Sequence, residues 1–113
     1  MDIDTALKEA MEIDGALGVS LVDYESGMAL GSLGGGKYLN LEVAGAGNTE
    51  VIRAKMRTLE SLGLKDTIDD ILITLGRQYH LIRLVAGQGH SGLFIYLALA
   101  RHHLKRIEGE ITV

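Results

Sequence analysis

The 113-residue sequence contains no cysteine and no proline, and both absences restrict its chemistry. Without cysteine it can form neither disulfides nor thiolate sites. Without proline its turns depend on glycine, of which there are 15. An excess of basic residues is also missing: the formal net charge is −4, which argues against a nucleic-acid or anionic-membrane surface.

Long apolar runs are missing as well. The longest, such as residues 93–100, are far too short to span a bilayer, so we expect no direct membrane insertion. No secretory signal is recognised, and we expect a cytoplasmic protein. Nearly half of the residues are nonetheless hydrophobic, which is enough for an ample core, and the length fits a single domain over residues 1–113.

Hydrophobic spacing and turn residues predict the order of helices and strands. Residues 93–99 are apolar on both faces, so this strand should lie centrally with a layer on each side. The whole order predicts an α+β sandwich with helices on both faces of a mainly antiparallel sheet. The predicted elements are a helix capped by Asp2 or Asp4 and ended by Gly15, strands at 17–22 and 28–33, a long helix at about 40–62, strands at 68–75, 79–85 and 93–99, and a last helix from about Ala100.

The long helix has three different sides. The side expected to pack on the sheet carries Leu41, Ala44, Val51, Ile52, Leu59 and Leu62. The side expected to face solvent carries Glu42, Glu50, Arg53, Arg57 and Glu60. A third, narrow stripe of small residues consists of Val43, Gly47, Ala54, Thr58 and Ser61. The start of the helix is open, because Gly45 and Gly47 each cost roughly 1 kcal/mol in a helix interior; residues 48–50 provide a later cap.

The segment Gly31–Lys37, GSLGGGK, fits the phosphate-loop pattern G-x-x-x-x-G-K. That motif needs Ser or Thr next to hold magnesium, and this chain has Tyr38. The preceding strand is predicted to be a hairpin arm rather than the first strand of a parallel sheet. We therefore interpret the segment as a glycine linker between a hairpin and the long helix.

Other patterns that suggest catalytic or metal chemistry lack the required context. Residues 87–92 match the dinucleotide pattern G-x-G-x-x-G, but a strand rather than a helix follows them. His102 and His103 are adjacent, whereas two metal ligands on one helix need a spacing of three or four. Asp69 and Asp70 point to opposite sides of a strand. We expect no catalytic residue, no cofactor and no metal site, and hence not an enzyme.

The order of apolar and glycine positions resembles a known family. Residues 13–23, followed by Glu25-Ser26-Gly27-Met28, are similar to the opening of Roadblock (dynein light-chain type) domains. The likeness continues over nearly the whole chain, at Leu62-Gly63, 71–74, 79–83 and 98–104. The resemblance suggests a bacterial stand-alone member of this family.

The resemblance implies a profilin-like sandwich, in which a five-stranded antiparallel sheet has the order 2-1-5-4-3. The long helix would cover one face and two terminal helices the other. It also implies a homodimer, in which the third strands join edge to edge and the long helices lie side by side. Stand-alone members of the family often act with small Ras-like GTPases as regulators, activators or scaffolds.

The residues agree with such pairing at two points. The strand at 68–75 carries an apolar run that an unpaired edge should avoid, and the small-residue stripe would let a second helix approach closely. The alternative is a monomer whose edge is protected by Asp69 and Asp70. Arg53 and Arg57 are candidates for facing a partner. The expected dimer interface consists of Asp70, Ile71, Leu72, Ile73 and Thr74 on the strand, with Val43, Gly47, Ala54, Thr58 and Ser61 on the helix.

The expected function is that of a non-enzymatic, homodimeric regulator or scaffold of a small Ras-like GTPase, which it would activate or localise. Two alternatives stay open. One is a protein-interaction scaffold whose binding ignores the nucleotide state. The other is a small-ligand or nucleotide-binding domain that uses residues 31–37. No nucleic-acid partner is expected.

Overall fold

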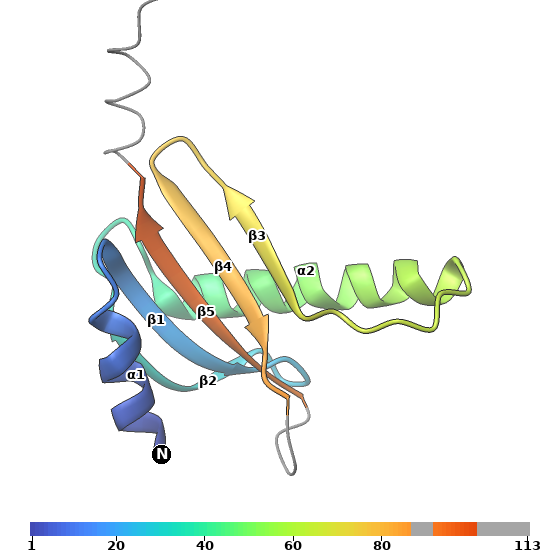
Figure 1. The fold of residues 1–113 in the computed structure, drawn as a ribbon, viewed down its shortest axis with the longest axis horizontal. Helices are drawn as coiled ribbons and strands as arrows, with labels where there is room; N and C mark the ends of the chain where they lie inside the picture. Colours follow the sequence, from blue (N-terminus) through green and yellow to red (C-terminus); the bar gives the residue numbers. More distant parts are fainter. Residues whose placement is uncertain (87–91, 102–113) are drawn as a thin grey trace, which may run out of the picture.

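A computed structural model of the chain describes residues 1–86 and 92–101 and shows helices on both sides of one sheet (Figure 1). The five strands are antiparallel to their neighbours, in the order β2-β1-β5-β4-β3. The predicted α+β class and strand order are therefore confirmed. The elements are α1 (Ile3–Met11), β1 (Ala16–Asp23), β2 (Met28–Gly34), α2 (Leu41–Ser61), β3 (Asp70–Thr74), β4 (Gln78–Leu84) and β5 (Leu93–Ala100).

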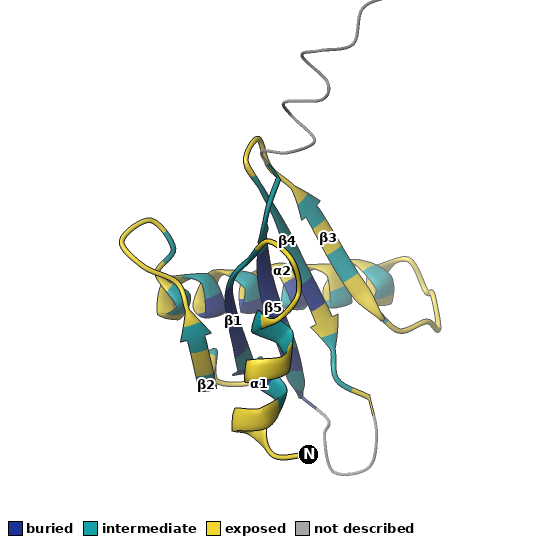
Figure 2. Cartoon of the chain, turned by 60° about the vertical axis from the view of Figure 1, so that its left-hand side comes forward, coloured by how far each residue is buried: buried dark blue, intermediate teal, exposed yellow. Residues whose placement is uncertain are grey.

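The two helices lie on opposite faces of the sheet, with α2 behind it and α1 in front of it in Figure 1. Figure 2 shows that the buried residues form the middle of this sandwich. The second terminal helix was predicted to start near Ala100, but Ala100 is the last residue of β5. The rest of that prediction, residues 102–113, lies outside the described residues, as does most of the glycine-rich connection at 87–91.

The central strand β5 contributes to the core on both faces. Phe94, Tyr96 and Ala98 are fully buried on the α2 side, where they join Ile52 of the helix. Leu97 and its neighbours Ile95 and Leu99 pack on the opposite side, where Leu7 of α1 covers them. Fully burying one large apolar side chain contributes roughly 1.5–3 kcal/mol to the free energy of folding. The side chains buried on both faces of β5 therefore contribute to its stability.

Polar side chains cap the two helices. Asp2 accepts a hydrogen bond from the Thr5 N–H at 2.8 Å, and this bond lowers the pKa of the Asp2 carboxyl. The helix ends at Met11 rather than at Gly15; Gly15, with φ +85°, instead turns the chain into β1. The oxygen of Asn40 accepts from the N–H groups that open α2, so the early start of this helix is confirmed despite its two glycines.

The buried side of α2 differs from the predicted one. Gly45, Thr49 and Ile52 face the sheet, whereas Val51 is 38% and Leu62 65% exposed. A Cβ added to Gly45 would lie 3.4 Å from a methyl group of Val22, so this residue faces β1 at ordinary contact distance. The predicted face is therefore wrong at Val51 and Leu62.

We predict that Asn40→Ala destabilises the fold by about 1 kcal/mol, because two helix N–H groups lose their acceptor. Asn40→Ser, which can still cap the helix, should recover most of the loss. Urea unfolding followed by circular dichroism measures both. Equal stability of the wild type and Asn40→Ala would contradict this account of how α2 begins.

Candidate interaction surface

The strand β3 forms one edge of the sheet, as predicted. It is hydrogen-bonded to β4 only, and it spans Asp70–Thr74 rather than the whole of 68–75. Ile71 and Ile73 are half-buried toward α2, while Leu72 is 58% exposed. Asp70 forms an ion pair with Arg83 of β4 at 2.6 Å, so its charge is matched within the chain. The outer edge of β3 is therefore apolar at its centre.

The small-residue stripe of α2 lies on the exposed side of that helix. Its members, Val43, Gly47, Ala54, Thr58 and Ser61, are all exposed, and the buried residues lie on the other side. Figures 1 and 2 both show that the second half of α2 extends past the β3 edge. The end of the helix therefore projects beyond the sheet of its own chain.

Large apolar side chains are exposed on α2, in the segment after it and at β3 and its end, at Val51, Leu62, Leu64, Leu72 and Leu75. Exposed apolar residues scattered singly are ordinary, but residues gathered along one side of a protein indicate an interaction surface. We call β3 together with the exposed side of α2 the β3–α2 surface.

The two arginines of α2 have different roles. The Arg53 guanidinium donates a hydrogen bond to the backbone carbonyl of Glu25 in the β1–β2 turn and lies 3.6 Å from the Glu50 carboxylate. Arg53 is thus an internal contact between α2 and the hairpin, which corrects its expected solvent-facing role. Arg57 is exposed. It remains the arginine of this pair that can face a partner.

The glycine-rich segment does not form a phosphate loop. Gly31 to Gly34 belong to β2 and pair with β1, so of this segment Gly35, Gly36 and Lys37 lie in the connection 35–40 between the strand and α2. The interpretation as a linker is correct for this second part and wrong for the first. The α2 N-terminus is also occupied by its own cap, Asn40.

No helix within residues 1–86 and 92–101 is long and apolar enough to cross a membrane. A search of the same described residues finds no group of three or more metal-ligating side chains. The adjacent histidines His102 and His103 lie outside this part of the chain, so their expected role stays a prediction.

Sequence reasoning missed a polar pair on the α2 side of the sheet. The register of β4 and β5 places His80 opposite Ala98 and Tyr96 opposite Ile82, which brings the two aromatic rings together. Their centroids are 5.2 Å apart in an edge-to-face arrangement, and Nε2 of His80 lies 2.6 Å from Oε1 of Gln78. Burial lowers the pKa of His80 below its ordinary value of 6.5 and raises the pKa of Tyr96 to about 12.

Comparison with solved structures identifies the architecture. MglB from Myxococcus xanthus aligns with a TM-score of 0.75 at 14% identity, over 96% of this chain and 79% of that one. A Roadblock/LC7 domain from Streptomyces avermitilis aligns with a TM-score of 0.71 at 13% identity, over 92% and 85% of the two chains. The chain has a Roadblock-type fold. The gliding protein MglB from Thermus thermophilus agrees, with a TM-score of 0.70 at 15% identity over 95% and 79%.

The likeness to these Roadblock-type structures is one of fold. No protein-family model matches the sequence, and no curated protein matches it. The resemblance inferred from the apolar and glycine pattern is thus confirmed for the Roadblock fold, including the strand order of the sheet.

The different contacts of the two α2 arginines generate a test. Arg53→Ala should lower the free energy of unfolding by roughly 1 kcal/mol, because the Glu25 carbonyl loses a charged donor. Arg57→Ala, a matched change one helical turn later, should stay within about 0.5 kcal/mol of the wild type. Urea unfolding of the two variants measures both losses of stability. A larger loss for Arg57→Ala than for Arg53→Ala would contradict the roles assigned to the two arginines.

The pKa of His80 predicts how stability depends on pH. The folded-state pKa lies below the unfolded value near 6.5, so the unfolded chain binds the proton more readily. The contribution of neutral His80 is complete above that value and is lost as the pH falls through the folded-state pKa. The free energy of unfolding, measured by denaturation at several pH values from about 8 to 5, should therefore fall less for His80→Gln than for the wild type. Parallel declines would show that His80 is not responsible.

Proposed function

We propose that this chain is a non-enzymatic homodimeric regulator or scaffold of a small Ras-like GTPase, acting in the cytoplasm. The observation that carries the proposal is the β3–α2 surface: a free, apolar strand edge beside an exposed helix side of small residues, on a Roadblock-type fold. Self-association accounts for this surface, and the family resemblance supplies the GTPase.

The edge strand supports pairing with a second copy. Ile71, Leu72 and Ile73 form an apolar run on an edge that has no proline and whose one charge, Asp70, is paired with Arg83. Natural sheets protect a free edge with charges or bulges, or they pair it. A two-fold axis through the middle of β3 would place the strand antiparallel to its twin and satisfy both edges at once.

The long helix supports the same arrangement. The end of α2 projects past β3, so a sheet continued by a second copy would lie beneath it (Figure 1). Gly47 and Ala54 on its exposed side would let a second helix approach closely, and a Cβ added to Gly47 would meet no atom within 4 Å in the single chain. One solved neighbour is MglB with a tetrameric arrangement, which aligns over 86% of this chain.

The regulatory role rests on the family resemblance and on what the arginines can do. Arg53 is bound to the β1–β2 turn and would have to break that contact to reach a partner's nucleotide. Arg57 is exposed, but it projects from a solvated helix side. Any stimulation of hydrolysis would therefore act by positioning the catalytic groups of the GTPase itself, rather than through either arginine of α2.

The test is a pull-down from native lysate with the tagged full chain, run in parallel with a GTP analogue and with GDP. The proposal predicts a small GTPase enriched with the analogue, whose hydrolysis rate then changes in the presence of the purified protein. Arg57→Ala should leave that effect intact. Partners retained equally in both lanes, with no GTPase among them, would instead favour a nucleotide-independent scaffold.

The dimer is tested separately by a charge at the edge. Leu72→Lys should convert the protein to a monomer of 12.2 kDa in light scattering, because two lysines would face each other across the joined strands. Leu30→Lys is the matched control, since Leu30 is 53% exposed on the opposite edge strand β2. A wild-type monomer, or dimers of both variants, would contradict pairing through β3.

A further inference from the structure

A hollow opens on the α2 side of the sheet, beside the first turns of α2, and Val43 and Gly47 of the small-residue stripe line part of it. Its volume is about 450 Å³. Three parts of the chain surround it: the loop before α2, the first turns of α2, and the two strands β4 and β5. The residues with polar side chains that line it are Lys37, Tyr38, Asn40, Asn48, His80 and Tyr96.

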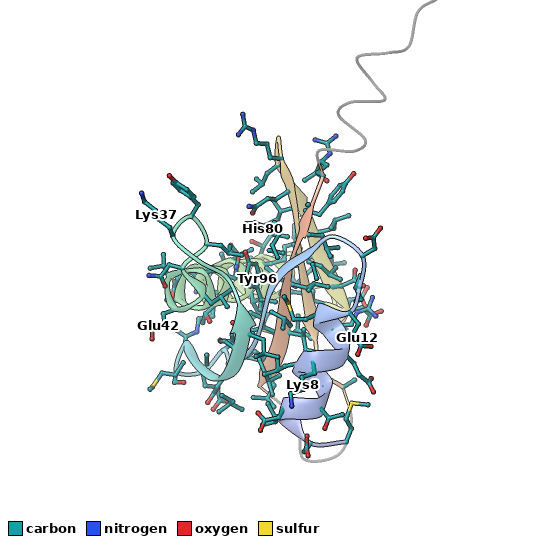
Figure 3. All side chains as sticks on the ribbon, turned by 90° about the vertical axis from the view of Figure 1, so that its left-hand side faces the viewer. Lys8, Glu12, Lys37, Glu42, His80 and Tyr96 are labelled. Carbon is teal, nitrogen blue, oxygen red and sulfur yellow. The ribbon has the colours of Figure 1, made fainter. Side chains whose placement is uncertain are left out.

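We infer that this hollow binds a small molecule carrying an anionic oxygen group, a carboxylate or a phosphate, through the Tyr96 hydroxyl, Asn48 and Lys37. Figure 3 shows His80 and Tyr96 between the sheet and the loop that carries Lys37. The inference is independent of the proposed GTPase role.

The Tyr96 hydroxyl is the first reason. Its side chain is fully buried, and among the described residues the hydroxyl has no hydrogen-bond partner within reach. Leaving a buried polar group without a hydrogen-bond partner costs more free energy than forming the bond contributes. Most buried polar groups in proteins are therefore bonded to a protein group or to water. Tyr96 lines the hollow, so a ligand there would supply the missing acceptor.

The protonation of the pair is the second reason. Burial keeps the proton on Tyr96 and keeps His80 neutral near pH 7. A neutral imidazole has one N–H donor, and a phenol has one O–H donor. With His80 Nε2 beside the Gln78 amide oxygen, the ring is held in place at the edge of Tyr96. His80 donates its one N–H to Gln78, so among the described residues the neutral donor left without an acceptor here is the Tyr96 hydroxyl.

The charge of the lining is the third reason. Lys37 is the one charged side chain among the lining residues, and no carboxylate lines the hollow. The Asn48 amide adds a further pair of donors. The N–H groups that open α2 are already bonded to Asn40, so the helix terminus is not what attracts the anion. Donors with one cation and no anion fit a negatively charged oxygen group.

Titration of the full chain with inorganic phosphate and, separately, with acetate and succinate tests the inference, followed by ¹H–¹⁵N NMR. We expect at least one probe to shift the signals of Lys37, Asn48, His80 and Tyr96 together and saturably. Comparing the phosphate titration with the acetate and succinate titrations distinguishes recognition of phosphate from recognition of a carboxylate. Shifts in all three arms that never saturate would show unspecific salt effects and overturn the inference.

Tyr96→Phe removes only the hydroxyl and should weaken the binding of that probe about tenfold or more, the loss typical of a hydrogen bond to a charged group. The same change should leave the apo protein as stable as the wild type or more so, since no bond is lost. Tyr79→Phe, on the opposite face of the neighbouring strand, is the matched control and should leave the affinity unchanged.

Lys37→Gln should weaken binding and reduce its dependence on salt. Binding that survives Tyr96→Phe, or the absence of any probe-dependent shift at these residues, would show that the hydroxyl is satisfied by solvent alone and would overturn the inference. Neither result bears on the GTPase proposal, which is tested by the nucleotide-dependent pull-down.

Discussion

The structure depends on the need to cover β5 on both faces and along both edges. Phe94 and Tyr96 on one side and Leu97 on the other leave no face that can meet water. Antiparallel partners β1 and β4 flank the strand, and helices are required above and below it. The positions of α1, α2 and the two outer strands follow from this one constraint.

Because β5 lies in the middle of the sheet, the free edges of the sheet belong to β2 and β3. These edges are not equivalent. The β2 edge lies beside the beginning of α2, whereas α2 extends past β3 and leaves apolar residues such as Leu62 and Leu72 exposed on that side. In the proposed dimer, the projection of α2 past β3 favours this edge over that of β2, where Met28 and Leu30 are also exposed.

Much of this fold could be predicted from the sequence because its signals are local. The two-sided apolar run of β5 and the helix cap at Asp2 each act within a few residues. The side of α2 that packs on the sheet was harder to predict from the sequence. Its buried side depends on contacts between distant parts of the chain, such as that of Gly45 with Val22, and amphipathicity alone selected Val51 instead.

The candidate sites show the same limit. The β3 edge could be predicted because strand order and apolar run agree, but the contact of Arg53 with the Glu25 carbonyl joins residues 28 positions apart, and no local pattern indicates it. The alternation of side chains along each strand places His80 of β4 and Tyr96 of β5 on the α2 side of the sheet. Their meeting depends on the register of β4 against β5, which the sequence does not specify.

The central claim is that β3 joins a second copy of itself, and the absence of cysteine allows a direct measurement. A single cysteine at Leu72 would stand near its twin, because opposed residues of antiparallel strands lie about 5 Å apart. Treatment of Leu72→Cys with a short thiol crosslinker should give a covalent dimer on a denaturing gel, and Leu30→Cys should not. No crosslink at position 72, or equal crosslinking at both positions, would contradict the account.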